Sequence, residues 1–170
     1  MHSFLDLADH SGEEIAALLA LAKRLEQHPE PKALAVKIIG LLFFNPGLRT
    51  MLSFQAGMAR LGGSSFVISA GNGTWQLETR RGAIMDGVAA EHVREGVPVL
   101  SHYCDVLGIR AFAGGTNLNE DLAETSFREM TSLVAKPVIN MESAVNHPCQ
   151  ALADWKTMDD LGLPQRAKFV

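Results

Sequence analysis

The sequence is poor in residues that would mark several common kinds of site. Only two cysteines occur among 170 residues, Cys104 and Cys149, and they form neither a CxxC pair nor a spacing typical of zinc sites. A reduced intracellular compartment is the simpler interpretation, which leaves a disulfide between them open. The six histidines show no i, i+4 pairing, so the sequence predicts no metal site.

Nucleotide-binding motifs and an excess of positive charge are also missing. No GxxxxGK[ST] sequence occurs, and the Gly-Asn-Gly segment at 71–73 lacks the third glycine of a dinucleotide fingerprint, so we predict no cofactor. The formal net charge of −4 argues against nucleic acid as the main partner, because phosphate backbones are bound by basic faces. No apolar run approaches a membrane span, and Asp6 and Asp9 stand where a signal peptide would be basic and then apolar. We therefore interpret the protein as cytoplasmic, with no membrane partner.

The most informative stretch of the chain is Ile38–Leu61. A wholly apolar run from Ile38 to Phe44 is interrupted by Asn-Pro-Gly, and a helical pattern then begins with Arg49 and Thr50 in its first turn. A helix start offers unpaired N–H groups and the positive end of the helix dipole. Together with the guanidinium of Arg49, this favours binding of a phosphate or carboxylate.

Strand and helix patterns alternate along the rest of the chain. We expect helices over 11–28, where Ser11 and Glu14 form a capping box, and over 49–61, 90–103, 117–133 and 147–162. Pro98 should kink the third of these helices or end it early. Strands are expected at Ile38–Phe44, Ser65–Ser69, Val106–Phe112 and Pro137–Asn140, and the start of a fifth at Arg166–Val170, whereas 74–90 shows no period and is predicted to be a loop.

This alternation predicts an α/β fold: a doubly wound, mainly parallel four-stranded sheet with helices on both faces. In such sheets, ligands bind beyond the carboxyl ends of the strands. Arg49 and Thr50 follow the first strand, Arg110 ends the third, and Glu142 and His147 follow the fourth. The loop that contains Trp75 follows the second strand. We therefore expect these side chains at one edge of the sheet.

Each candidate also has a plain structural interpretation. Arg49 and Thr50 could form an ordinary first helical turn. Arg110, within an apolar strand, requires an anionic partner, which is either a structural carboxylate or a ligand. His147 could cap its helix, or, as a neutral imidazole, donate a hydrogen bond to a carbonyl group. Trp75 could pin its loop to the core or reach a partner, and Cys149, which has no evident base, is assigned to packing.

Three segments resemble the signatures of the aspartate and ornithine carbamoyltransferase family. They are the FFNPGLRTMLSF sequence at 43–54, Gly-Ile-Arg at 108–110 and His-Pro-Cys-Gln at 147–150. Their order and separation match the carbamoyl-phosphate domain of that family over essentially the whole chain. Other segments resemble the branch that acts on N-acylated ornithine: Phe43–Pro46, Trp75, Met85–Gly87, Glu91-His92 and Val138–Glu142.

The resemblance implies a function and a set of site residues. The phosphate of carbamoyl phosphate would lie on the helix start, and the δ-amine of an N-acylornithine would attack the carbamoyl carbon, as in arginine synthesis. Arg49, Arg110 and His147 would be the catalytic residues. Thr50, Arg110 and His147 would polarise the carbamoyl oxygen, Gln150 would hold the carbamoyl nitrogen, and Trp75 and Glu142 would bind the second substrate. The implied carbamoyl-phosphate-binding residues are Gly47, Leu48, Arg49, Thr50, Arg110, His147 and Gln150.

The resemblance also implies an organisation. Residues 1–146 would form the carbamoyl-phosphate-binding domain, 147–165 a linking helix, and 166–170 the start of a missing amino-acid-binding domain. The family forms trimers through this domain, with the loop that carries Trp75 reaching a neighbour's site. A homotrimer is therefore expected.

The sequence departs from the family at two informative places. The usual Ser-Thr-Arg-Thr-Arg is here Gly-Leu-Arg-Thr-Met at 47–51, which removes a hydroxyl and a positive charge. Ala90 replaces an acid typical of the acetylornithine enzymes, which leaves room for a longer acyl group such as succinyl. Two alternatives stay open: an ornithine carbamoyltransferase, or a non-catalytic anion-binding module, which the missing second domain favours.

Overall fold

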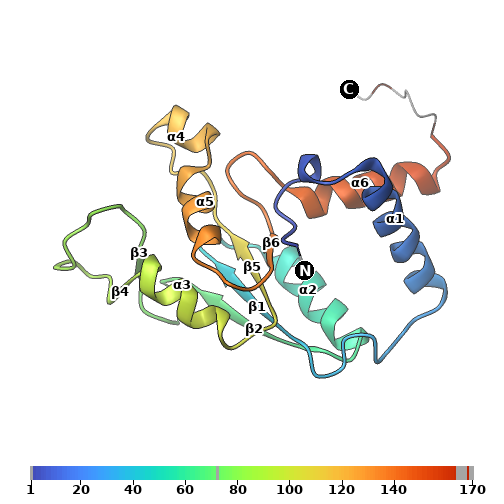
Figure 1. Ribbon diagram of the computed structural model, residues 1–170, viewed down its shortest axis with the longest axis horizontal. Helices are drawn as coiled ribbons and strands as arrows, with labels where there is room; N and C mark the ends of the chain where they lie inside the picture. Colours follow the sequence, from blue (N-terminus) through green and yellow to red (C-terminus); the bar gives the residue numbers. More distant parts are fainter. Residues whose placement is uncertain (1, 72, 164–167, 169–170) are drawn as a thin grey trace.

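A four-stranded parallel sheet lies at the centre of the computed structural model, which describes residues 2–71, 73–163 and 168 (Figure 1). The strand order is β2-β1-β5-β6. The chain adds β2 on one side of β1 and then β5 and β6 on the other side, so the strand order reverses between β1 and β5. This confirms the predicted doubly wound α/β fold. The strands are β1 Ile38–Phe43, β2 Ser64–Ser69, β5 Val106–Arg110 and β6 Val138–Asn140.

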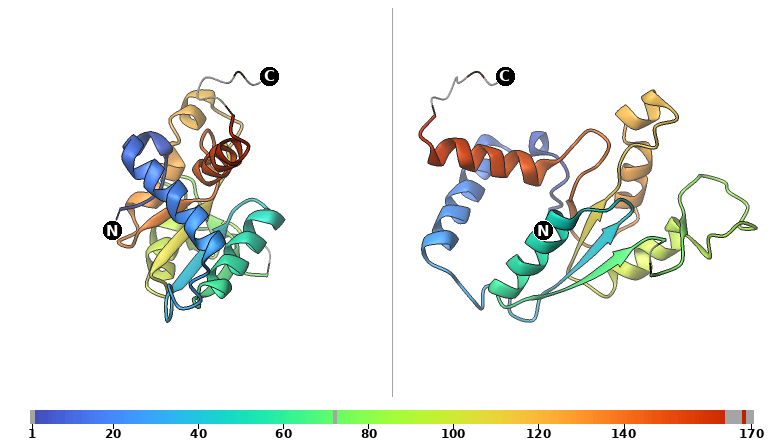
Figure 2. Two further views of the ribbon diagram at one scale, coloured as in Figure 1. Left: turned by 90° about the vertical axis from the view of Figure 1, so that its right-hand side faces the viewer. Right: turned by 180° about the vertical axis from the view of Figure 1, so that it is seen from behind.

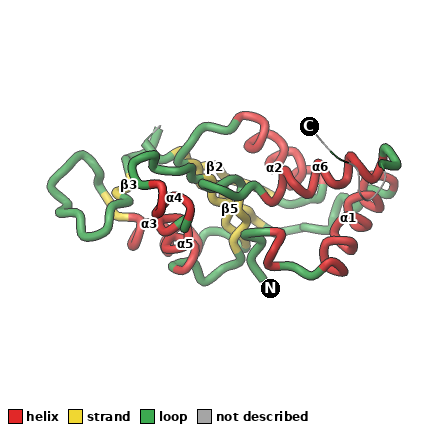
Figure 3. The backbone as a smooth tube through the Cα atoms, turned by 90° about the horizontal axis from the view of Figure 1, so that it is seen from above, coloured by secondary structure: helices red, strands yellow, loops and turns green. Residues whose placement is uncertain are grey.

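Helices cover both faces of the sheet (Figure 3). Side chains alternate along β1, so Leu42 points to the core beneath α3 and α5, whereas Leu41 and Phe43 point to the core beneath α2. Leu41 and Leu42 are both fully buried. Burial on both faces explains why the strand sequences are continuous apolar runs rather than alternating ones.

Three of the helices agree with the sequence prediction. α1 spans Gly12–Gln27, and Ser11 and Glu14 form the expected reciprocal capping box. α2 spans Leu48–Arg60, and α6 spans Pro148–Asp160 with its proline at the first helical position. α1 and α6 contact one another on the α2 side of the sheet and stand apart from the strands (Figure 2).

Two predicted helices differ in the structure. α3 spans Val93–Ser101: it starts after Ala90 because 91–92 form a short strand, and it runs past Pro98 into its last turn. The single helix predicted over 117–133 is broken into α4 Leu118–Leu122 and α5 Thr125–Ser132. The break lies at Glu124, whose φ of 51° is left-handed and interrupts the helix.

The segment predicted as a loop over 74–90 is closed by a small ladder that was not predicted. β3 Leu77–Glu78 pairs in parallel with β4 Glu91–His92. The chain between these strands projects away from the sheet (Figure 1). It is tied back to α5 through Arg81, whose Nε lies 2.6 Å from Glu129 Oε2.

The N-terminal segment extends the sheet through a single bridge. Phe4 pairs with Ile139 of β6, and its N–H donates to Val138 O at 2.7 Å. A short 3-10 helix, η1 Leu7–Asp9, then leads to α1. Within the described residues, no helix is long and apolar enough to cross a membrane. The strand expected at 166–170 falls, apart from Lys168, outside the described residues.

Candidate active site

Gly47, which follows β1, and Arg110, at the end of β5, lie side by side at the point where the strand order reverses. Phe43 is in register with Arg110, and the Phe44 N–H donates to Arg110 O at 2.9 Å. A Cβ atom on Gly47 would lie only 2.8 Å from Arg110 Nε. The absence of a side chain at Gly47 therefore makes room for the Arg110 guanidinium, at the position where ligands bind in doubly wound sheets.

Arg110 is buried and forms an ion pair with Glu142. Its Nη1 atom donates to Glu142 Oε2 and to the Met141 carbonyl oxygen at 3.2 Å, and its guanidinium lies 4.6 Å from the Phe112 ring centroid. Of the two partners that the sequence left open for Arg110, the structure contains the structural carboxylate. The Nε atom is buried and has no hydrogen-bond partner within the described part of the chain.

His147 joins this pair from the start of α6. Its Nε2 atom lies 3.4 Å from Glu142 Oε2, so one carboxylate faces both Arg110 and His147. His147 occupies the N-cap position of α6, but its side chain makes no capping hydrogen bond. Its Nδ1 atom is buried without a partner among the described residues. The capping interpretation of His147 is therefore wrong. We call Arg110, Glu142 and His147 the polar cluster.

The start of α2 lies next to the polar cluster. Gly47 is the N-cap and offers no side-chain hydrogen bond to the first turn; the first backbone bond of the helix runs from Met51 N to Gly47 O. The N–H groups of Leu48, Arg49 and Thr50 are therefore without capping side chains. Arg49 is exposed and has no ion-pair partner among the described residues.

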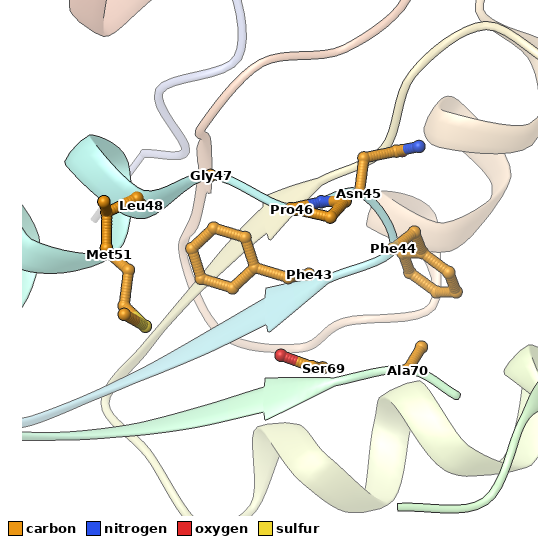
Figure 4. A pocket seen from close by; sticks show the side chains of 9 residues that line it. All are labelled: Phe43, Phe44, Asn45, Pro46, Gly47, Leu48, Met51, Ser69 and Ala70. Atoms are coloured by element: carbon orange, nitrogen blue, oxygen red, sulfur yellow. The ribbon is translucent and has the colours of Figure 1, made fainter. Parts of the chain in front are cut away.

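A cavity of about 270 Å³ lies beside this helix start, between the ends of β1 and β2 (Figure 4). Figure 4 shows the Phe43 ring turned toward Leu48 and Met51. Met51, where the family resemblance leads one to expect an arginine, packs instead into the apolar core beneath α2. The lining residues are Phe43, Phe44, Asn45, Pro46, Gly47, Leu48, Met51, Ser69 and Ala70.

Two of the predicted site residues, Gln150 and Trp75, do not contact the polar cluster through hydrogen bonds. Gln150 lies in the first turn of α6, where its Nε2 atom donates to Asp154 Oδ1 at 2.8 Å. Trp75 is 62% exposed and donates from Nε1 to Glu91 Oε2 at 3.3 Å, next to the β3–β4 ladder. No hydrogen bond between described residues joins either side chain to Arg110 or His147.

Cys149 follows the polar cluster in sequence but does not have the properties of a nucleophile. Burial raises the pKa of its thiol to about 11, and its Sγ atom faces the Asn140 carbonyl oxygen at 3.6 Å. A thiol with a raised pKa is a poor nucleophile at neutral pH. Among the described residues, no three His, Cys, Asp or Glu side chains are grouped as a metal site requires.

Four polar residues that were not predicted as site residues hold the site loops. Asn45 Oδ1 accepts a hydrogen bond from the Phe112 N–H at 2.8 Å, which joins the loop after β1 to the end of β5. Glu124, Asn140 and Ser143 are buried and hydrogen-bonded to one another beneath the loop that carries Glu142. The only sequence signal for the break at Glu124 is the Thr-Ser pair that follows it, because these residues favour helix starts.

Comparison with known proteins agrees with the fold. Residues 2–160 match the family model described as aspartate/ornithine carbamoyltransferase, carbamoyl-P binding domain. The helix-covered parallel sheet, with an uncapped helix start beside an arginine and a histidine, therefore matches a carbamoyl-phosphate-binding domain. The chain belongs to the aspartate/ornithine carbamoyltransferase family.

Among curated proteins, the chain is 40% identical to N-succinylornithine carbamoyltransferase of Bacteroides thetaiotaomicron over 134 residues, which is 79% of this chain and 42% of that protein. It is 38% identical to N-acetylornithine carbamoyltransferase of Xanthomonas campestris pv. campestris over 150 residues, 88% of this chain and 44% of that protein. The chain therefore spans less than half the length of these relatives.

A solved structure has the same fold over half of its length. The crystal structure of an N-acetyl-L-ornithine transcarbamylase mutant complexed with carbamyl phosphate and N-succinyl-L-norvaline superposes with a TM-score of 0.89 at 35% identity. The match covers 98% of this chain and 50% of that chain.

Proposed function

We propose that this chain binds carbamoyl phosphate and forms the carbamoyl-phosphate half of an N-acylornithine carbamoyltransferase. The observation that carries the proposal is the meeting of the uncapped α2 start with Arg110 and His147 at one edge of the sheet. Relatives named for acetylornithine and succinylornithine, and a similar structure complexed with carbamyl phosphate, support it. Within this proposal, residues 1–146 are the binding domain, 147–165 the linking helix and 166–170 the start of an amino-acid-binding domain.

In the proposed complex, the phosphate group lies on the N–H groups of Gly47, Leu48, Arg49 and Thr50, next to the Arg49 guanidinium. These donors and the helix dipole stabilise its negative charge. Arg110 and His147, with the Thr50 hydroxyl, donate to the carbamoyl oxygen, and Gln150 holds the carbamoyl nitrogen. Gln150 donates from Nε2 to Asp154, and its Oε1 is the atom that can accept from a carbamoyl N–H.

The proposed reaction is a direct transfer. The δ-amine of the N-acylornithine attacks the carbamoyl carbon, the bond from that carbon to the phosphate oxygen breaks, and the amine proton is lost as phosphate departs. The products are N-acylcitrulline and phosphate, a step in arginine biosynthesis. Catalysis then consists of orientation and of stabilising charge on the carbamoyl oxygen and the leaving phosphate.

Glu142 and Trp75 are proposed to bind the acylornithine, and Ala90 to set the length of its acyl group. Ala90 is exposed at the end of the projecting segment, directly before Glu91, to which Trp75 donates. The segment projects from the sheet and exposes Ile84 and Val88, which supports a homotrimer in which it reaches a neighbouring subunit. Sedimentation analysis should then give three times the 18.4 kDa chain mass.

The deciding experiment is calorimetric titration with carbamoyl phosphate, followed by citrulline-forming assays with succinylornithine, acetylornithine and ornithine. The assay uses the chain joined to the proposed amino-acid-binding domain. Saturable binding with turnover of an acylated ornithine supports the proposal. Turnover of free ornithine alone would identify an ornithine carbamoyltransferase instead, binding without turnover would indicate a non-catalytic module, and the absence of binding would refute all three.

A further inference from the structure

Glu124 is a buried acid outside the polar cluster, and it holds the loop that carries Glu142. Glu124 lies between α4 and α5 and is only 5% exposed. Its carboxylate accepts hydrogen bonds from three groups of the 143–146 loop: the Ser143 hydroxyl, the Val145 N–H at 3.1 Å and the Asn146 Nδ2 at 3.2 Å. The break in the predicted helix thus places a carboxylate beneath the site.

The contacts of Glu124 extend to the backbone of Glu142. The Ser143 hydroxyl oxygen also accepts a hydrogen bond from Asn140 Nδ2 at 2.8 Å, and Asn140 is fully buried. Asn140 Oδ1 in turn accepts from the Glu142 N–H at 3.0 Å. Glu142 has a φ of 135°, a backbone conformation that L residues rarely adopt. A continuous chain of hydrogen bonds therefore connects Glu124 to the residue that pairs with Arg110.

The same contacts fix the residue before His147. The Ser143 N–H donates to Asn146 O at 2.8 Å, which closes the loop into a tight turn, while the Asn146 side chain donates to Glu124. His147 follows directly and begins α6 without a capping side chain of its own. The direction in which His147 leaves the turn is thus set through Asn146.

The burial and the backbone conformation of Glu124 both cost folding free energy, which is not expected of a residue that only fills space. Among the described residues no Lys, Arg or His forms an ion pair with Glu124, so its buried carboxylate depends on neutral donors. Its left-handed backbone also interrupts a helix. An acceptor-only group matches the site, because all three groups that point at it are donors.

We propose that Glu124 is a positioning residue that holds the 142–147 loop so that Glu142 and His147 face Arg110. It acts through Ser143 and Asn140 on Glu142, and through Asn146 on His147. This inference rests on the proposed function only for its ligand, carbamoyl phosphate. The loop geometry is measurable without any ligand, so the role of Glu124 and the proposed function can be refuted separately.

The test compares Glu124→Gln with Glu120→Gln, a matched change at an exposed position of α4. A glutamine can accept from Ser143 and Val145, but its amide N–H₂ faces the Asn146 N–H₂, and two donors cannot bond to each other. In Glu124→Gln we expect faster amide hydrogen exchange over 143–147 and changed NMR chemical shifts of the His147 imidazole. Affinity for carbamoyl phosphate should fall at least about tenfold, because a displaced His147 loses roughly one well-placed hydrogen bond to the ligand. Glu120→Gln should change none of these.

Two further variants separate positioning from general stability and from misfolding. Val97→Ala removes buried atoms from the core beneath α3 and α5 and should lower the melting temperature while leaving affinity and the His147 chemical shifts unchanged. If Glu124→Gln does not fold, Ser143→Ala removes the hydroxyl that joins Glu124 to Asn140 and should give the same exchange and chemical-shift changes. Unchanged exchange and unchanged His147 chemical shifts in a folded variant of this pair would overturn the proposal, as would an equal loss of affinity in Val97→Ala. If the unmodified chain does not bind carbamoyl phosphate, the proposed function fails, and the exchange and chemical-shift data still decide the role of Glu124.

Discussion

Arg110 donates from Nη1 to Glu142 Oε2, and that carboxylate oxygen also lies 3.4 Å from His147 Nε2. The two groups proposed to hold the carbamoyl oxygen therefore already face an oxygen of the protein. A ligand that uses Arg110 and His147 must compete with Glu142. The affinity for a ligand is thus the difference between the contacts that the ligand makes with Arg110 and His147 and those that Glu142 already makes with them. The Arg110–Glu142 ion pair both stabilises the fold and occupies the site.

Glu142→Gln tests this competition. A neutral amide binds the guanidinium more weakly than a carboxylate does, so carbamoyl phosphate should bind about tenfold more tightly, a gain of roughly 1.4 kcal/mol. The free energy of unfolding should fall by about 1–3 kcal/mol, because the buried Arg110 keeps a weaker partner. Calorimetry and urea denaturation measure the two effects, with Glu120→Gln as the control. Unchanged or weaker binding of carbamoyl phosphate would show that Glu142 does not compete.

Arg49→Ala separates binding from folding. Arg49 is exposed without an ion-pair partner in the described part of the chain, so the free energy of unfolding should change by less than about 0.5 kcal/mol. Affinity for carbamoyl phosphate should fall about ten- to a hundredfold through loss of charged hydrogen bonds to the phosphate. Arg60→Ala, at the exposed far end of the same helix, should leave affinity unchanged. Equal affinities in the two variants would remove Arg49 from the site.

The strands and the edge of the sheet that carries the site could be predicted from the sequence because their signals are local. A wholly apolar run followed by Asn-Pro-Gly marks both the end of β1 and the start of α2. Parallel pairing then places the end of every strand at one edge, which brings Arg110 beside Gly47 without any knowledge of contacts. The same rule places Glu142, 32 positions further along the chain, at this edge, but it does not predict that Glu142 pairs with Arg110.

The features that were missed depend on contacts between distant segments. Each strand of the β3–β4 ladder has only two residues, too few to show a period of their own. The sequence around Glu124 is compatible with a continuous helix. The left-handed conformation that breaks it is compensated by hydrogen bonds from Ser143 and Asn146. Propensity alone could not predict this break, because the stabilising groups lie in another part of the chain.

Gly47→Ala tests the close approach of α2 to Arg110. The φ of Gly47 is −160°, which any residue can adopt, so the cost of a side chain there is the 2.8 Å approach of its Cβ to Arg110 Nε. The displaced guanidinium should weaken carbamoyl phosphate binding and lower the free energy of unfolding by about 1–3 kcal/mol. In Gly57→Ala, where a Cβ meets nothing within 4 Å, the helix should become about 0.5–1 kcal/mol more stable with unchanged affinity. Equal behaviour of the two variants in denaturation and calorimetry would contradict the contact.

Cys149 gives a prediction that depends on pH. Its folded-state pKa of about 11, raised by burial from its ordinary value of 9.0, leaves about one thiol in a thousand ionised at pH 8. Iodoacetamide should therefore label Cys149 slowly in the folded protein and rapidly after unfolding, as measured by mass spectrometry. Because the unfolded thiol loses its proton first, the folded state holds more protons between pH 9 and 11, and stability should fall as the pH rises through that window. Cys149→Ala should reduce this slope without abolishing it, since burial also raises the pKa of Cys104. Rapid labelling of the folded protein at pH 8 would instead indicate an accessible thiolate and make Cys149 a candidate nucleophile.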